Sequence, residues 1–198
     1  MGFVRDYIAS FFLDAAEWAR GRSWILRILL LGIIAYIFLR HIFSAEYQSI
    51  FKGLNLGIHE LGHFVFGIFG QFIGVAGGTI AQLLAPVIGM VMFVFQRDYY
   101  GIAIAFGWLG TNFYDVAAYC GDARAMELPL VSPFGMGGCV HDWNFLLGET
   151  GLLSADKTIS FLFRTCGFFS FLFCLIFGAW LIYLMIKTHG EFKETAES

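Results

Sequence analysis

The sequence His59-Glu60-Leu61-Gly62-His63 holds two imidazoles and a carboxylate in a stretch that is otherwise apolar. On a helix, side chains four positions apart project from one face about one turn apart, so both histidines could reach a single zinc ion. Glu60 is then placed to take a proton from zinc-bound water, which is the chemistry of metal-assisted hydrolysis. With five histidines in 198 residues, chance alone would supply only about 0.005 such motifs.

A catalytic zinc usually has three protein ligands and one open position, so the two histidines need a partner. The adjacent residues His141 and Asp142 lie in a glycine-flanked part of the long connection 120–157. We prefer Asp142 as the third ligand, because one member of the pair can bind metal while the other orients a ligand. His141, Asp122 and Asp115 are the alternatives. The pair could also mark the start of a helix that Asp142 caps.

The composition indicates an integral, multi-pass membrane protein. The chain is 59% hydrophobic and 14% charged, whereas a soluble domain averages roughly 45–50% and 25%. Residues 64–96 and 165–186 contain no charged side chain, and each stretch is longer than the roughly 20 residues that cross a bilayer. The net charge is only −3 and the basic residues are scattered, so we expect membrane lipid as a partner and no nucleic acid.

The hydrophobic pattern predicts an all-α fold, a polytopic membrane helix bundle of about five transmembrane segments. The apolar segments cover approximately 23–43, 54–71, 77–96, 99–119 and 158–186. Residues 1–22 should form an amphipathic helix that lies in the membrane interface or packs on the protein's own membrane domain. We expect a membrane-embedded domain over 23–187, in which 120–157 is a functional loop, and a polar tail over 188–198.

The arginines around the first apolar segment predict the orientation of the chain. Arg20 and Arg22 precede this segment, Arg27 lies at its start, and only Arg40 follows at its far end. Because Lys and Arg are enriched in cytoplasmic loops, we expect a cytoplasmic N-terminus.

The four cysteines do not identify the cellular compartment. Cys166 and Cys174 lie in an apolar segment, where a free cysteine behaves as a small hydrophobic residue. Cys120 and Cys139 flank part of the long loop and could form a disulfide if that loop faces an oxidising space.

Two further patterns concern the surroundings of the histidine motif. The run 70–78 contains four glycines, which predicts a turn or a re-entrant stretch rather than a continuous helix and could border the active site. In the fourth segment, Asn112, Asp115, Tyr119 and Asp122 follow helical spacing down one face. This polar stripe should face the protein interior, because an ionised Asp in lipid costs about 2.5–3.5 kcal/mol. Alternatively, the helix emerges into the interface at Asp115.

A membrane-embedded H-E-x-x-H with a glycine-rich stretch after it and a distant aspartate ligand resembles the site-2 protease class of intramembrane zinc metalloproteases. The similarity is specific only at His59 to His63. In that family the aspartate usually lies in an Asn-x-x-Pro…Asp-Gly signature, whereas here Asp142 is followed by Trp143 and no Asp-Gly dipeptide occurs. The resemblance implies one zinc ion and cleavage of membrane-spanning or membrane-proximal segments of other proteins.

We therefore expect a metal-binding hydrolase, a zinc metalloendopeptidase of intramembrane proteolysis that acts on membrane proteins. Glu60 would remove a proton from water and pass it to the leaving amine. Gln82, Asn112 or Asn144 could hydrogen-bond the developing oxyanion or the substrate backbone. One alternative is a noncatalytic, protease-like membrane subunit or regulator of a larger complex. Another is a metal transporter that uses the polar stripe, although a single tight cluster makes a poor path.

Overall fold

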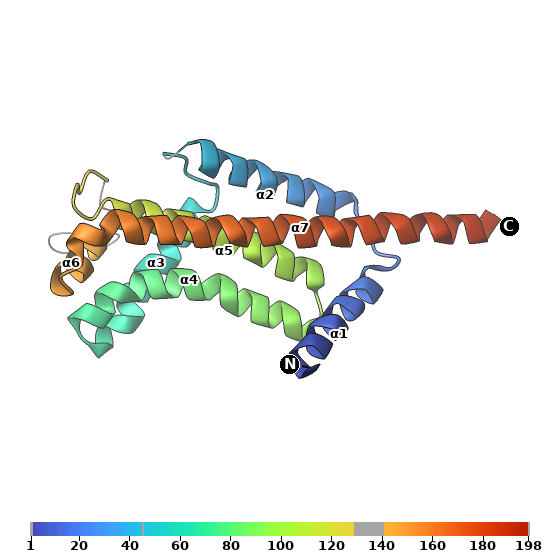
Figure 1. Ribbon diagram of the computed structural model, residues 1–198, viewed down its shortest axis with the longest axis horizontal. Coiled ribbons are helices and arrows are strands. Elements are labelled where there is room, and N and C mark those ends of the chain that lie inside the picture. Colours follow the sequence, from blue (N-terminus) through green and yellow to red (C-terminus); the bar gives the residue numbers. More distant parts are fainter. Residues whose placement is uncertain (1, 45, 129–140, 198) are drawn as a thin grey trace.

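The computed structural model describes residues 2–44, 46–128 and 141–197, and Figure 1 shows that these form helices. The α-helices are α1 (Gly2–Ala19), α2 (Ile25–Phe43), α3 (Lys52–Phe66), α4 (Gln71–Phe95), α5 (Tyr99–Gly121), α6 (Asp142–Glu149) and α7 (Asp156–Glu197). Two short 3-10 turns, η1 (Gly67–Phe69) and η2 (Leu153–Ala155), precede α4 and α7. The described ranges contain no strand, which confirms the all-α prediction.

Three helical segments of the described part are long and apolar enough to cross a membrane. They are α2, α4 and the stretch Leu153–His189, which contains most of α7. The shorter α3 has 15 residues, fewer than the roughly 20 that span a bilayer. The chain therefore has the helices of a membrane protein, and about five spans stays a prediction. The expected polar tail continues α7 as a helix to Glu197.

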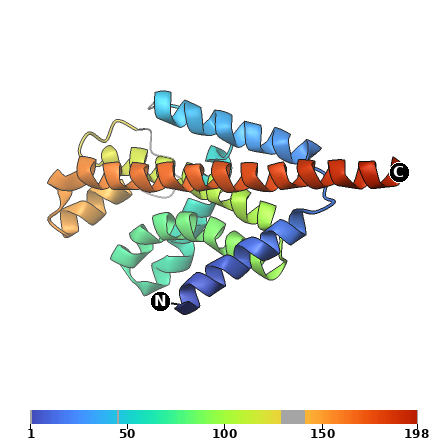
Figure 2. The same cartoon turned by 45° about the vertical axis from the view of Figure 1, so that its right-hand side comes forward.

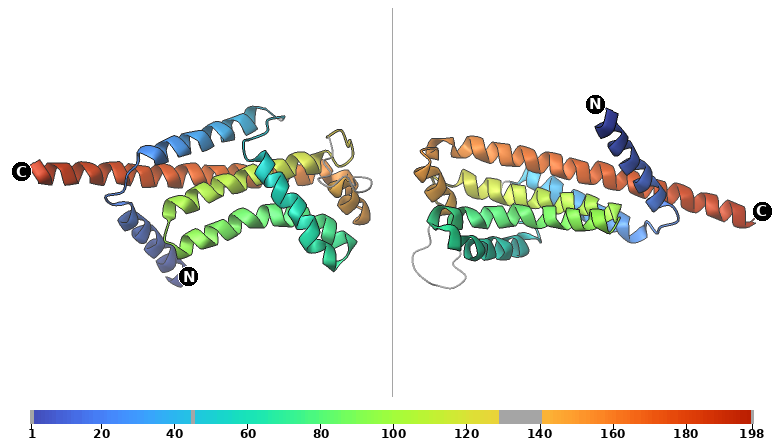
Figure 3. Two further views of the ribbon diagram at one scale, coloured as in Figure 1. Left: turned by 180° about the vertical axis from the view of Figure 1, so that it is seen from behind. Right: turned by 90° about the horizontal axis from the view of Figure 1, so that it is seen from below.

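The helices divide the molecule into two ends. α5 lies between α7 and α4 and packs along both of them (Figure 1; right panel of Figure 3). At one end α1 leaves the bundle at an angle, close to the start of α2 and to the turn between α4 and α5 (Figures 1 and 2). At the opposite end lie α6, the last turns of α5 and the start of α7.

An apolar core fills the space between α2, α5 and α7. Phe171 of α7 is fully buried, and its ring stacks on that of Phe38 at a centroid distance of 5.0 Å. Gly110 makes room for it, because a Cβ there would lie 2.7 Å from the Phe171 ring. Gly107 makes room for Ile34 in the same way. Small residues on α5 thus let the neighbouring helices approach closely, as is common in membrane helix packing.

The amphipathic helix α1 uses only part of its apolar face against the bundle. Phe11 stacks on Phe177 at 5.9 Å, and Trp18 makes an edge contact with Tyr99 at 5.9 Å. Tyr7 and Leu13 stay exposed. Packing on the protein's own domain therefore accounts for part of this face, and the exposed side chains are free to lie in a membrane interface.

The prediction of a turn or re-entrant stretch over 70–78 is wrong. Only Gly70 has a turn conformation, with φ of 100°, and α4 begins at the next residue and continues through the other glycines. The reason is the crossing of α3 and α4: a Cβ on Gly77 would lie 2.7 Å from the carbonyl oxygen of Gly62. Close backbone packing overrides the helix-propensity cost of about 1 kcal/mol per glycine.

The cysteines in the described ranges are not paired with one another. Cys120 and Cys174 are buried, Cys166 is exposed, and the Cys120 thiol lies 3.7 Å from the carbonyl oxygen of Asp156. Cys139, and with it the predicted Cys120–Cys139 disulfide, lies outside the described residues.

Candidate metal centre

His59, His63 and Asp142 come together where α3 meets the start of α6. The Nε2 atom of His59 lies 2.9 Å from Asp142 Oδ2, and the Nε2 atom of His63 lies 3.1 Å from the same oxygen. Possible ligand atoms of all three residues lie within 4.8 Å of one another. The structure thus brings together the two histidines of the motif and the preferred third ligand, in a group that could hold a metal ion.

The regular helix of α3 presents both imidazoles to Asp142. Their ring centroids are 4.7 Å apart, and the ring planes are nearly perpendicular at 83°. The His59 side chain is buried, whereas the His63 side chain is 26% exposed. The group is therefore covered on the His59 side and open on the His63 side.

Each histidine has an oxygen acceptor at its other ring nitrogen. His59 Nδ1 lies 3.0 Å from Gln82 Oε1, and His63 Nδ1 lies 2.9 Å from the carbonyl oxygen of Gly74. An imidazole that donates its Nδ1–H to such an oxygen has its lone pair on Nε2, the tautomer that binds a metal. The sequence led us to expect Gln82 beside a substrate or oxyanion; the structure places it behind a candidate ligand.

This arrangement of donors and acceptors fits a bound cation. With both Nδ1–H groups committed to oxygens, the two Nε2 lone pairs and one carboxylate oxygen point at the same small region. Three acceptors that converge in this way need extra protons or a cation between them. Without a cation, protons on the two Nε2 atoms fill this role and donate to Asp142. Burial raises the pKa of Asp142, but these hydrogen bonds from His59 and His63 outweigh it and hold that pKa below its ordinary value. The carboxylate is therefore ionised and able to bind a metal.

Gly78 of α4 forms the floor of the site. A Cβ at this position would lie 2.6 Å from His59 Nε2 and 2.7 Å from His63 Cε1. These distances are far below van der Waals contact, so a larger residue would displace both rings. The glycine run does border the candidate site, as expected, although it does so as part of a helix.

A buried polar cluster fixes the position of α3 on α5. Asn55, one turn before His59, donates from Nδ2 to Asp115 Oδ2 at 2.8 Å and accepts from Trp108 Nε1 at 2.9 Å. Lys52 Nζ lies 3.6 Å from the other Asp115 oxygen. Sequence reasoning missed Asn55, although its spacing of four before His59 places it on the same helix face.

Separate contacts hold Asp142 in place. His141 caps α6, because its Nδ1 accepts from the backbone N–H of Asn144 at 3.2 Å. The Tyr119 hydroxyl accepts from the backbone N–H of Asp142 at 3.1 Å, and the Tyr119 ring lies 4.3 Å from the His141 ring. Asn144 Nδ2 donates to the carbonyl oxygen of Ala123 at 2.8 Å. The suggestion that Asp142 caps this helix is wrong, because His141 does so and leaves the carboxylate free for the histidines.

The alternative third ligands have other partners. Asp122 accepts from the backbone N–H groups of Glu127 at 3.1 Å and Leu128 at 2.9 Å, and it lies 3.4 Å from His141 Nε2. Burial raises the pKa of Asp122, but these donors hold it below its ordinary value. Asp115 is bound by the α3 cluster described above. The structure therefore does not bring His141, Asp122 or Asp115 into the group of three.

The polar stripe on α5 faces the interior, as predicted. Asn112 is fully buried, and only 8% of Asp115 and 9% of Asp122 are exposed. Asn112 donates to the carbonyl oxygen of Trp108 at 2.9 Å rather than to any of the three candidate ligands. The stripe therefore serves the packing of α3 and of the segment after α5.

Glu60 follows His59 on α3 and is half-buried. It makes no hydrogen bond or ion pair with another residue of the described ranges. Its carboxylate is therefore not committed to a structural contact there.

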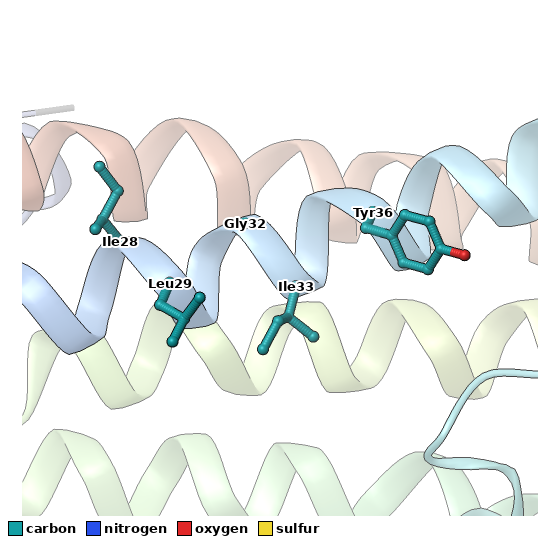
Figure 4. A pocket seen from close by; sticks show the side chains of 5 residues that line it. All are labelled: Ile28, Leu29, Gly32, Ile33 and Tyr36. Atoms are coloured by element: carbon teal, nitrogen blue, oxygen red, sulfur yellow. The ribbon is translucent and has the colours of Figure 1, made fainter.

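A surface groove lies on another part of the molecule. Figure 4 shows its lining, which belongs to α2 and is apolar except for one hydroxyl: Ile28, Leu29, Gly32, Ile33 and Tyr36. None of these residues belongs to α3, α4 or α6, so the groove is no part of the metal centre.

Comparisons of this chain with protein-family models, with curated proteins and with solved structures give no match.

Proposed function

We propose that this chain is a membrane-embedded zinc metalloendopeptidase that hydrolyses peptide bonds in membrane-spanning or membrane-proximal segments of other proteins. The observation that carries the proposal is the convergence of His59, His63 and Asp142, with Glu60 next to the first histidine. Two imidazoles and one carboxylate form a ligand set of catalytic zinc sites, which keep a further position open. The exposed edge of His63 is consistent with such an open position.

The residues around the group have distinct tasks in this proposal. His59, His63 and Asp142 would hold the ion, and Gln82 would keep the His59 ring in the binding tautomer. When bound, zinc supplies Lewis acidity and a nucleophile that is available at neutral pH. Glu60 accepts a proton as water attacks the peptide carbonyl, and it returns this proton to the leaving amine.

The fold supports a site that works inside a membrane. α4, which contributes Gln82 and Gly78, is one of the three candidate spans, so the centre adjoins an apolar layer. Peptide bonds within a substrate helix are already hydrogen-bonded, and such a helix must unwind locally before it can be cut. We therefore expect cleavage near helix ends or at helix-breaking residues of the substrate.

Replacement of Glu60 by Gln tests the proposal. The full-length protein is expressed in cells and reconstituted in liposomes, and new N-termini in membrane proteins are compared between the wild type and Glu60→Gln. We expect the variant to keep its metal and to lose turnover by about 10²- to 10⁴-fold, the usual contribution of general acid–base catalysis. Glu149→Gln, an exposed position at the end of α6, is the control and should cleave normally.

Undiminished cleavage by the Glu60 variant would refute a hydrolytic role for this residue. Metal in both proteins without cleavage by either would favour the second candidate, a noncatalytic membrane subunit or regulator of a larger complex.

A further inference from the structure

We propose that the metal centre opens toward the membrane face opposite to the face that carries α1, and that its substrates are chain segments that leave the membrane on that opposite face. This proposal rests on the proposed function and names the substrate class of the same site. It follows from the depth of the site along the helices, from what closes it on the other side, and from the distribution of positive charge.

The metal centre lies close to one end of the helices that surround it. Gly78, which touches both imidazoles, follows Gln71 at the start of α4 by two turns. At about 1.5 Å per residue, this places the site about 10 Å along a helix that must cross an apolar layer of about 30 Å. On α5, Tyr119 contacts Asp142 from the last turn before Gly121. The site therefore lies in the outer third of the layer, at the end where α6 is found (Figure 1).

The side of the site that faces the α1 end is closed. There Asn55 of α3 is bonded to Trp108 and Asp115 of α5, and Thr111 and Asn112 of α5 are fully buried. Pro86, one turn beyond Gln82 on α4, is buried as well. On the other side His63 is partly exposed, and Asp142 belongs to α6, beyond the last turn of α5. Among the residues that the structure describes, the ligands are therefore accessible from the α6 end on the His63 side.

The distribution of cations indicates which face is which. Arg20 and Arg22 before α2, and Arg97 after α4, are exposed at the α1 end and form no ion pair within the described residues. At the metal end, Arg124 is paired with Asp156 at 2.8 Å, whereas Arg40, Lys157 and Arg164 form no ion pair within the described residues. Unpaired cations are still more numerous at the α1 end, where Arg27 and Lys187 add to the three already named. Unpaired Lys and Arg next to membrane spans favour the cytoplasmic side. The α1 end is then cytoplasmic, and the substrate is a segment that emerges on the non-cytoplasmic side.

Thiol labelling from each side of the membrane tests this inference on the full-length protein. Single cysteines are introduced by His63→Cys, Glu149→Cys and Ser23→Cys into a chain whose four native cysteines are replaced. Right-side-out and inside-out vesicles are treated with a membrane-impermeant maleimide. We expect His63→Cys and Glu149→Cys to react only in right-side-out vesicles, and Ser23→Cys only in inside-out vesicles. Phe64→Cys is the control: Phe64 is 82% exposed on the outer side of α3, which we expect to meet lipid, so this cysteine should not react from either face.

The outcome does not depend on metal binding or on cleavage. Labelling of His63→Cys from the same face as Ser23→Cys, or from neither face, would overturn the inference and leave the proposed function standing. Conversely, absence of cleavage by the metal-loaded wild type would refute the proposed function and leave the labelling pattern unchanged. Labelling of the His63 and Glu149 variants only in inside-out vesicles would overturn the non-cytoplasmic assignment.

Discussion

The apolar core between α2, α5 and α7 and the candidate metal centre between α3, α4 and α6 are built from opposite kinds of contact. In the core, large side chains such as Phe171 and Phe38 stack on one another over glycines. In the metal centre, backbone approaches backbone at Gly77, and hydrogen bonds of Asn55 and Gln82 fix the remaining geometry. The stability of the fold and the geometry of the site therefore depend on different residues, and substitutions should affect them separately.

Loss of a core side chain should have the largest effect on stability. We expect Phe171→Ala to lower the free energy of unfolding by about 3–5 kcal/mol, because it leaves a cavity at a fully buried position. The metal content of the protein that remains folded should not change. Unfolding in detergent and elemental analysis measure the two quantities. Phe169→Ala, at a 60% exposed position of the same helix, is the control; an equal loss in both variants would contradict the assignment of the core.

A methyl group at position 78 should instead abolish metal binding and change the stability of the fold much less. We expect Gly78→Ala to abolish metal binding and to cost only about 1–3 kcal/mol of stability, because its Cβ would collide with both imidazoles. Gly89→Ala in the same helix is the matched control, since its Cβ would meet only a Trp108 ring atom at 3.9 Å, an ordinary contact. Metal titration and thermal unfolding of both variants test this. Unchanged metal affinity in Gly78→Ala would show that the site is not where we place it.

Removal of a hydrogen bond behind a ligand should have the smallest effect. Gln82→Met keeps the size of the side chain and removes the oxygen that accepts from His59 Nδ1. We expect metal affinity to fall about 10- to 100-fold, as for other partners of metal-bound histidines, while the thermal stability stays close to that of the wild type. Gln96→Met at the exposed end of α4 should leave metal affinity unchanged. Equal metal affinities of the Gln82 and Gln96 variants would show that Gln82 does not support a metal ligand.

The sequence was sufficient to predict the pair His59 and His63, because a spacing of four on one helix is a local property. The third partner is not local, since Asp142 lies 83 positions from His59. Asp115 and Asp122 have the same chemistry, and only the fold shows that other donors already bind them. The choice of Asp142 rested on its neighbour His141, which proves to cap α6.

The structure departs from the sequence-based prediction where packing between distant segments decides the result. The glycines after η1 have low helix propensity, yet they form part of α4 because Gly62 of α3 needs their bare backbone. Asn55 belongs to no recognisable sequence motif. It positions α3 only through its hydrogen bonds to Trp108 and Asp115 of α5. The order and approximate limits of α2, α3, α5 and α7 agree with the predicted apolar segments, because long apolar segments carry a strong periodic signal, whereas the start of α4 was not predicted and the short α6 was expected only as an alternative.

The metal content of the purified protein tests the central claim most directly. Elemental analysis compares the wild type with His63→Ala, Asp142→Ala and Asp122→Asn in the same detergent. We predict about one zinc ion per chain in the wild type, its loss in His63→Ala and Asp142→Ala, and its retention in Asp122→Asn, because a catalytic site needs three protein ligands. No bound metal in the wild type, or full metal content in Asp142→Ala, would contradict the account.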